Sequence, residues 1–338
     1  MNLQALQALV EQKLVTVQKH PDTEFYIYNY SPLVQYQRLW NEITLMTRGL
    51  ILDANGNIIA RPFKKFFNLE EHSPAEIPQE PFDVFDKADG SLGILYWLQE
   101  QPCIATRGSF TSDQAFHATQ LLRDRYSHLF PKLERNVTYL FEIIYPENRI
   151  VVDYGEMDDL LLLAVIDNQT GLDLPLPTDL GFPVITHYDG IHDLTQLKAL
   201  EQDNKEGFVI RFKHGFRLKV KFSEYVRLHR IITQTSSTVV WEHLAAEKSL
   251  EELLERVPDE FYEWVKQTKS ELEGKFNAIL DEAQTTLKIF PTRKECAEYF
   301  LTQKYPHVMF RLLDQKDPAE VIWKMVKTAY SKPFKIET

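Results

Sequence analysis

The sequence contains very little cysteine. Its 338 residues include two cysteines, Cys103 and Cys296, which lie far apart in the chain. Two distant cysteines provide neither a disulfide framework nor the paired spacing of a zinc site. We therefore expect a reducing compartment and predict a cytoplasmic protein.

Long hydrophobic runs are also absent. The longest apolar run, Leu160 to Ile166, is far shorter than the ~20 residues that a membrane-spanning helix requires, and we interpret it as a buried strand. Residues 1–20 spread leucines and valines among glutamines without a continuous apolar core. This pattern argues against a secretory signal peptide and predicts an amphipathic helix. No association with a membrane is expected.

An excess of positive charge is missing too. The chain has 38 lysines and arginines against 49 aspartates and glutamates, a net charge of −11. Proteins that coat nucleic acid without specificity are usually basic. Any binding of a polyanion is therefore expected at a confined site. Basic residues are concentrated at 61–65 and 211–230, although Lys64 and Lys213 could equally belong to solvated faces.

The distribution of residue types changes near residue 235. Before it, short β-branched and aromatic runs alternate with turn clusters, which predicts a mainly antiparallel α+β domain over residues 1–235. The expected strands include 25–28, 49–52, 57–59, 139–144, 150–152 and 207–212.

After residue 235, helical patterns dominate, and we predict a small all-helical domain over residues 236–338. Thr292 with Glu295, and Asp317 with Glu320, have the spacing of capping boxes, the second with Pro318 at the first helical position.

The most informative motif is Lys87-Ala88-Asp89-Gly90. Asp-Gly between the apolar segments 84–85 and 92–97 is typical of a β-hairpin turn. The same motif can present Lys87 as a nucleophile, and the two interpretations are compatible. Asp89 could be a base, a metal contact or a turn former. We favour the turn, with a positive φ at Gly90.

A lysine amine attacks only in its neutral form, so neighbouring cations or desolvation must favour that form. Lys219 and Lys221 could supply such charge, because their spacing places both on one side of a strand. The same two lysines could stabilise negative charge on a phosphate.

Five segments follow one another in a fixed order. They are Thr47-Arg48-Gly49-Leu50, Lys87-Ala88-Asp89-Gly90, Phe141-Glu142-Ile143-Ile144, Glu206-Gly207-Phe208-Val209-Ile210 and Leu218-Lys219-Val220-Lys221. In this order they resemble the signature of the covalent nucleotidyltransferases, which include ATP-dependent DNA ligases, RNA ligases and mRNA capping enzymes. Residues 60–69, 145–151 and 224–229 narrow the resemblance to the bacteriophage RNA ligase 1 family, over roughly residues 25 to 230.

The resemblance implies an ATP-dependent RNA ligase with an adenylyltransferase domain. ATP would be the cofactor, and its AMP would become covalently attached to Lys87, with Lys219 and Lys221 facing the α-phosphate. Mg²⁺ or Mn²⁺ is implied as well. Glu142 and Glu206 would contact the metal or the nucleotide, in roles that the sequence leaves interchangeable.

Three further residues match nucleotide contacts of the family. Arg48 would reach the ribose and later the substrate phosphate, Lys65 would lie near the pyrophosphate or nucleotide, and Tyr225 would lie near the lysine pair. The sequence departs from the family at Arg107, where a lysine is expected, which leaves the role of Arg107 open.

The implied substrate is RNA with 5′-phosphate and 3′-hydroxyl ends, with nicked tRNA and RNA repair as the narrower expectation and a monomer as the expected state. Three alternatives stay open: a DNA ligase, an mRNA capping guanylyltransferase and a noncatalytic RNA-binding protein. The first two usually carry a five-stranded barrel after the nucleotidyltransferase domain. The helical pattern after residue 235 argues against both.

Overall fold

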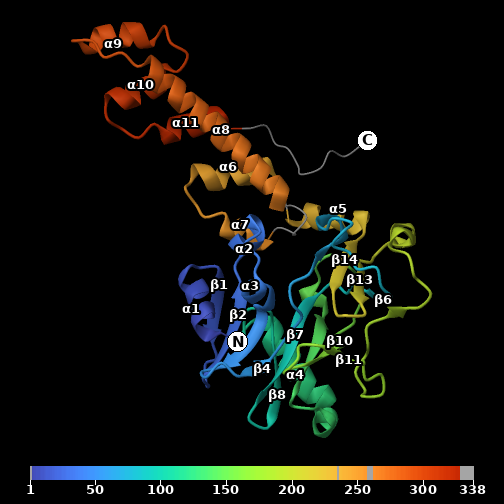
Figure 1. Cartoon of the computed structure of the whole chain (residues 1–338). Helices are drawn as coiled ribbons and strands as arrows, with labels where there is room; N and C mark the ends of the chain where they lie inside the picture. The colour runs from blue at the N-terminus through green and yellow to red at the C-terminus, as the bar shows by residue number, and fades with distance from the viewer. Residues whose placement is uncertain (1, 234–235, 257–261, 328–338) are drawn as a thin grey trace. The chain divides into compact units, whose positions relative to one another are not determined.

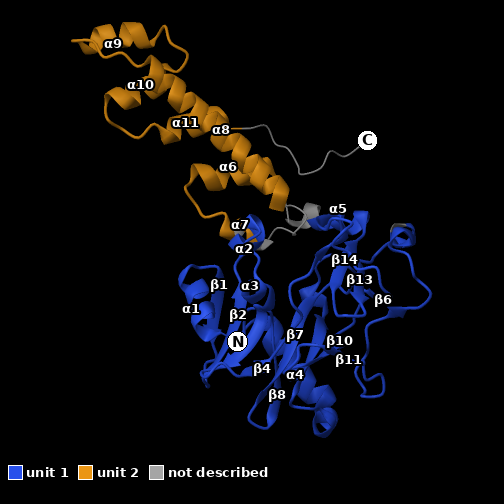
Figure 2. Cartoon of the chain, in the orientation of Figure 1, with its two compact units in different colours: residues 1–232 blue, residues 233–338 orange. Residues whose placement is uncertain are grey.

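The computed structural model describes residues 2–233, 236–256 and 262–327. They form two compact units, residues 1–232 and residues 233–338 (Figure 2). The first unit is built on antiparallel sheets, and helices make up the described part of the second. The predicted α+β class is therefore confirmed.

The first unit contains three sheets, which we name A, B and C. Sheet A has the order β1 (Val15–Lys19), β2 (Phe25–Tyr30), β3 (Arg48–Asp53) and β4 (Ile58–Ala60). Sheet B has the order β12 (His187–Tyr188), β6 (Phe82–Asp86), β13 (Gly207–Phe212), β14 (Arg217–Lys221) and β5 (Phe67–Asn68), of which β14 and β5 are parallel. Sheet C has the order β11 (Asp173–Leu174), β10 (Asp159–Asp167), β9 (Val137–Ile144), β7 (Ser91–Leu98) and β8 (Gln101–Ala105).

Helices surround these sheets. They are α1 (Leu3–Glu11), α2 (Pro32–Gln37), α3 (Glu42–Met46), α4 (Asp113–Tyr126) and α5 (Ser223–Thr233), with 3-10 turns at Leu69–Glu71, Ser127–Lys132, Pro146–Asn148 and Leu194–Leu200. Figure 1 shows α4 beside the strands of sheet C. The α4 helix begins after Ser112, whose side chain accepts a hydrogen bond from the Ala115 N–H. It buries Leu121 and Leu122 in the same core cluster as Leu160 of β10, which is the buried strand that the sequence predicted.

Three local predictions are wrong. The helix expected over residues 1–20 ends at Glu11, and β1 follows it. Residues 150–152 form a loop instead of a strand. The segments on either side of Asp89-Gly90 are not a hairpin, because β6 belongs to sheet B and β7 to sheet C. The Lys87 motif therefore connects two sheets, a long-range arrangement that turn propensity does not reveal.

The second unit is built around one long helix. Its helices are α6 (Ser237–Ala245), α7 (Glu251–Arg256), α8 (Tyr262–Thr286), α9 (Arg293–Phe300), α10 (Pro306–Leu313) and α11 (Ala319–Val326). Helices α6, α10 and α11 pack against α8. The Trp241 indole N–H donates to the Trp323 carbonyl at 2.9 Å.

One of the two predicted capping boxes forms. Thr292 caps α9 reciprocally with Glu295, as predicted. The second prediction is wrong, because Pro318 is the N-cap of α11 and Asp317 accepts from the Ala319 N–H instead.

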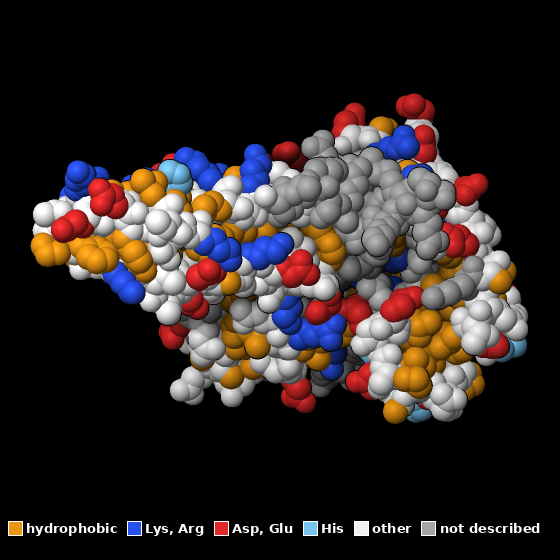
Figure 3. Space-filling model, turned by 90° about the horizontal axis from the view of Figure 1, so that it is seen from above, with side chains coloured by type: hydrophobic (Ala, Val, Ile, Leu, Met, Phe, Trp, Pro, Cys, Tyr) orange, Lys and Arg blue, Asp and Glu red, His pale blue; other side chains and the backbone are white. Residues whose placement is uncertain are grey.

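Figure 3 shows acidic, basic and hydrophobic side chains interspersed over this unit. In the described parts of the chain, no helix is long and apolar enough to cross a bilayer.

Candidate active site

Lys87 lies directly after β6 and faces a buried carboxylate. Its Nζ is 2.8 Å from Oε1 of Glu206, and Lys221 Nζ is 3.3 Å from the same oxygen. The backbone fixes this arrangement, since the Lys87 N–H donates to the Gly207 carbonyl at 2.9 Å. Glu206 is 3% exposed. Because burial of an unpaired carboxylate is costly, the two lysines and Glu206 form a mutually dependent group.

Strand alternation places further cations on the same face of sheet B. Phe85 pairs with Val209, which pairs in turn with Lys219, and Lys221 lies two residues beyond Lys219 on β14. Phe85 packs with Ile144 of sheet C in one hydrophobic cluster, so this face lies toward sheet C. The structure therefore brings Lys87, Lys219 and Lys221 to one face between two sheets.

Glu142, on β9 of sheet C, approaches the same group. Its Oε1 accepts a hydrogen bond from the Gly90 N–H at 2.9 Å. Burial raises the pKa of the Glu142 carboxyl to about 7, with Lys87 opposing the shift and Glu206 adding to it. Both predicted carboxylates thus lie within electrostatic reach of Lys87, and Glu142 can change its charge near neutral pH.

Gly90 is required for a reason other than the predicted one. Its φ is not positive, so the expectation of a left-handed turn is wrong. A Cβ at this position would lie 2.5 Å from the Ile143 carbonyl oxygen and 3.1 Å from Cγ of Glu142. The glycine therefore permits β9 to approach the Lys87 loop closely enough for the Glu142 hydrogen bond.

Asp89 is a clamp between distant segments. One carboxylate oxygen accepts from the backbone N–H groups of Val151 and Val152, each at 2.8 Å, and the other accepts from the Tyr225 hydroxyl at 2.8 Å. The favoured interpretation of Asp89 as a turn former is therefore wrong. Asp89 lies 136 residues from Tyr225 in sequence, and its carboxylate ties the 150–152 loop and α5 to the loop that contains Lys87.

Tyr225 lies close to the lysine pair. The Lys221 ammonium is 5.4 Å from the centroid of the Tyr225 ring.

Tyr154, which the sequence reasoning did not single out, also contacts the Lys87 loop. Its hydroxyl oxygen accepts a hydrogen bond from the Asp89 backbone N–H at 2.8 Å. Burial raises the pKa of Tyr154. No short motif marks this tyrosine, because the contact spans 65 residues.

A second group of cations, which we call the Tyr30 cation cluster, consists of Arg48, Lys65 and Arg107. Lys65 Nζ and the Arg107 guanidinium each lie 5.6 Å from the Tyr30 ring centroid, and the Arg48 guanidinium lies 5.8 Å from that of Phe66. Gly49 would place a Cβ 3.1 Å from the Arg107 carbonyl oxygen, so β3 and the Arg107 loop approach closely. The structure thus joins Arg107 to two of the predicted nucleotide contacts.

The carboxylates suit a divalent cation that is shared with a polyphosphate. Within the described residues, no group of three or more His, Cys, Asp and Glu side chains could hold a metal alone. Magnesium is commonly held by one or two carboxylates together with substrate phosphates. Glu142 and Glu206 fit that requirement.

Comparison with known proteins confirms the predicted resemblance to RNA ligases. Residues 46–179 match a family model described as RNA ligase. A "Putative RNA ligase" of Thermovibrio ammonificans is 30% identical over 203 residues, which cover 55% of this chain and 53% of the relative. An RNA ligase of Rhodothermus phage RM378 is 23% identical, with 77% of each chain covered.

Among solved structures, the "Putative ATP-dependent DNA ligase from Aquifex aeolicus" has a TM-score of 0.51, 13% identity, and coverage of 94% of this chain and 100% of that chain. This likeness supports the fold alone. The chain spans about half the length of the Thermovibrio relative that it matches.

Proposed function

We propose that this protein is an ATP-dependent RNA ligase that seals a 5′-phosphate to a 3′-hydroxyl through three phosphoryl transfers. Lys87 Nζ attacks the α-phosphorus of ATP, and pyrophosphate leaves. An oxygen of the RNA 5′-phosphate then attacks the lysyl-AMP, and Lys87 leaves. Finally the 3′-hydroxyl attacks the activated 5′-phosphate, the phosphodiester forms, and AMP leaves.

The observation that carries this proposal is the placement of Lys87 and Lys221 on one oxygen of the buried Glu206. Glu206 positions the nucleophile and offers an acceptor for the proton that Lys87 must lose before attack. Lys219 and Lys221, on the same face, would stabilise the charge that develops on the α-phosphate oxygens. Phosphoryl transfer is accelerated mainly by such positioning and electrostatic stabilisation.

A magnesium or manganese ion held by Glu142 and Glu206 would neutralise phosphate charge and orient the pyrophosphate. The Tyr30 cation cluster supplies fixed positive charge for the polyphosphate without a metal. Arg107 presents a planar fork where the family has a compact ammonium, and the two recognise phosphate with different geometry. We propose that Arg107 nevertheless contacts the same polyphosphate.

The physiological substrate is proposed as broken RNA, with tRNA as a specific candidate that the helical unit would recognise. Lys324 pairs with Glu320, and Lys327 lies over the Trp241 ring, so both described lysines of this surface have local structural contacts. Lys332 and Lys335, which could also line an RNA backbone, lie outside the described residues.

Labelling tests the covalent step directly. The protein is first treated with pyrophosphate to remove any bound AMP, then incubated with magnesium and α-labelled ATP or GTP and separated on a denaturing gel. We expect label from ATP on the wild type and on Lys132→Ala, which removes an exposed lysine of the same unit, and none on Lys87→Ala. Label from GTP would indicate capping chemistry. No label from either nucleotide would indicate a noncatalytic protein.

Polynucleotide choice is tested by ligation. We expect sealing of 5′-phosphorylated RNA and not of the matching DNA. Efficient sealing of nicked DNA with little activity on RNA would replace the proposal with a DNA ligase, and sealing of RNA by Lys87→Ala would refute the lysyl-AMP mechanism.

A further inference from the structure

A cavity lies in the first unit, next to β5 and the start of β14. It has a volume of about 470 Å³ and lies between the segment 61–67, the end of β10 and the β13–β14 turn. We call it the Phe63 cavity. Its lining includes Arg61, Phe63, His72, Asp173, Phe216 and Arg217.

Its walls combine aromatic rings with positive charge. The Arg217 guanidinium lies 4.6 Å from the Phe63 ring centroid, and His72 lies edge-on to Phe216 with 5.3 Å between centroids. Asp173 is the single acidic residue among the residues that line the cavity. Aromatic faces with adjacent cations are a combination that binds nucleotide bases and phosphates.

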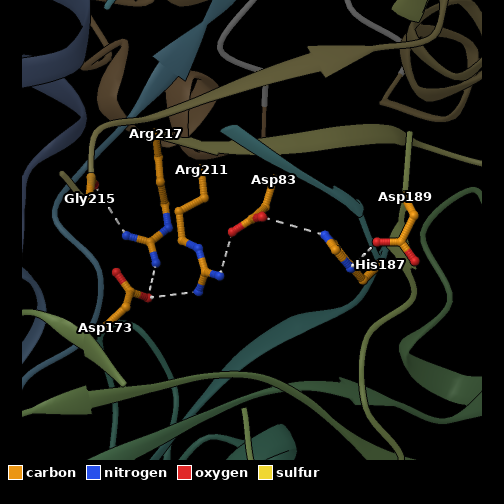
Figure 4. A network of polar contacts seen from close by, with 7 residues as sticks. All are labelled: Asp83, Asp173, His187, Asp189, Arg211, Gly215 and Arg217. Atoms are coloured by element: carbon orange, nitrogen blue, oxygen red, sulfur yellow. Dashed lines mark hydrogen bonds and ion pairs between the residues drawn. The ribbon is translucent and has the colours of Figure 1, made fainter. Parts of the chain in front are cut away.

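The single acidic residue is already paired. Figure 4 shows the guanidinium groups of Arg217 and Arg211 converging on Asp173. Arg211 also pairs with Asp83 at 2.7 Å. Asp173 therefore holds two arginines in place and leaves the lining positively charged overall.

Two buried nitrogens of the lining have no partner among the described residues. They are Nε of Arg61 and Nε2 of His72. Arg61 Nη1 donates to the Gln169 carbonyl at 3.3 Å, so this hydrogen bond fixes the side chain although Nε makes none among the described residues. Buried polar nitrogens are normally satisfied, so a polar ligand that reached these two side chains would supply hydrogen bonds that the protein itself does not.

The wall of this cavity is shared with the Tyr30 cation cluster. Lys65 lines the cavity and contacts the Tyr30 ring, and Phe66 lines it and contacts Arg48. Three residues after Lys65, Asn68 pairs with Lys219. The segment 65–68 therefore runs from the cavity to the lysine pair.

The chemistry of the proposed reaction points to an occupant, because Lys65, which lines the cavity, is the residue expected near the pyrophosphate. Attacking and leaving groups at phosphorus lie roughly in line. Lys87 is the attacking group in the first transfer and the leaving group in the second, so the RNA 5′-phosphate must enter where pyrophosphate left. The nucleotide that carries this phosphate then lies beyond the pyrophosphate position.

We propose that the Phe63 cavity binds the 5′-terminal nucleotide of the phosphorylated RNA strand, with its base against Phe63 and Phe216 and its phosphate groups near Arg61 and His72. This inference rests on the proposed RNA ligase function and extends it by naming the subsite that selects the phosphorylated end. It applies to the second transfer and not to the first.

The test separates the two transfers. Lysyl-AMP formation is measured against ATP concentration, and then AMP transfer from purified lysyl-AMP protein is measured in single turnovers against the concentration of a 5′-phosphorylated RNA. Arg61→Met removes the guanidinium but keeps a long side chain, and His72→Phe keeps the ring but removes its nitrogens. Lys132→Met is the control for loss of an exposed charge.

We expect Arg61→Met and His72→Phe to raise the half-saturating RNA concentration about tenfold, because each variant loses one hydrogen bond to a charged phosphate group. The half-saturating ATP concentration should change less than twofold, which also reports that the variants are folded. Lys132→Met should change neither. An equal change for ATP would assign the cavity to ATP, and no change for RNA would leave it without a role in RNA binding; either result overturns the inference.

A change in the RNA instead of the protein provides a second test, which does not depend on whether a variant folds. With wild-type protein, an abasic 5′-terminal nucleotide should raise the half-saturating RNA concentration roughly tenfold, the loss of one stacked base. Phe216→Leu should produce a similar loss with normal RNA and little further loss with abasic RNA. Equal affinity of the wild type for the two RNAs refutes the subsite, whereas absence of lysyl-AMP in the wild type refutes the proposed function itself.

Discussion

The interpretation of Asp89 as a clamp can be tested by one isosteric change, Asp89→Asn. Asparagine is as good a turn former as aspartate, so a turn role would survive this substitution. The clamp would be weakened, because its three hydrogen bonds, from Val151, Val152 and Tyr225, all end on the charged carboxylate. Hydrogen bonds to charged groups contribute about 1.5–3 kcal/mol each, roughly twice the contribution of neutral ones.

The amide of asparagine can still accept from Val151 and Val152 through its oxygen, so charge assistance is what is lost. We expect the free energy of local opening of the 150–152 loop to fall by about 1–3 kcal/mol. Amide hydrogen exchange measures this opening, and a loss of 1.4 kcal/mol reduces protection about tenfold. The Val151 and Val152 amides should lose protection while amides in the core of β10 keep it.

Tyr225→Phe is the matched control, since it removes the hydrogen bond to the other Asp89 oxygen and leaves both amides paired. The Val151 and Val152 amides should keep most of their protection in this variant. Lysyl-AMP formation should slow in Asp89→Asn because the loop that precedes Gly90 is held less firmly. Unchanged protection and an unchanged rate in Asp89→Asn would refute the clamp and restore the turn interpretation.

Two further predictions concern the contact between β9 and the loop that contains Lys87 and Gly90. Gly90→Ala places a Cβ 2.5 Å from the Ile143 carbonyl oxygen. We therefore expect the unfolding free energy, measured by urea titration, to fall by about 1–3 kcal/mol, and the rate of lysyl-AMP formation, measured by labelling, to fall at least tenfold. Wild-type values of both would show that the contact relaxes freely. For Glu142, the folded-state pKa of about 7 lies above its ordinary 4.5, so the folded protein binds the proton more tightly than the unfolded chain does. The protonated carboxyl therefore stabilises the folded state fully below pH 4.5, and this stabilisation is lost as pH rises to about 7. Glu142→Gln should flatten this part of the pH dependence of the unfolding free energy, and an unaltered slope between those pH values would contradict the raised pKa.

Much of the fold follows from local patterns in the sequence. The run 160–166 is a buried strand because continuous apolar sequence of that length suits a strand covered on both faces. The reciprocal cap of Thr292 and Glu295 forms because each group needs only a partner three residues away. Lys219 and Lys221 lie on one face because β-strand geometry alternates side chains. Each of these predictions depends on neighbours within a few residues.

The errors share the opposite property. Asp89-Gly90 has the composition of a hairpin turn, yet Gly90 is needed because of the carbonyl of Ile143, which lies 53 residues further along the chain. Residues 150–152 have strand composition, yet the N–H groups of Val151 and Val152 bond to the Asp89 carboxylate instead of to a neighbouring strand. Local preferences were overridden by tertiary hydrogen bonds, which a single sequence does not display.

The acidic composition and the proposed polyanionic substrates are compatible because of where the cations lie. Lys87 and Lys221 converge on Glu206, and Arg211 and Arg217 converge on Asp173, on side chains that are all less than a quarter exposed. A carboxylate that holds two cations keeps them positioned and limits the cost of burying like charges together. Phosphate oxygens that enter beside such a pair meet preorganised donors, so local geometry provides the attraction that net charge does not.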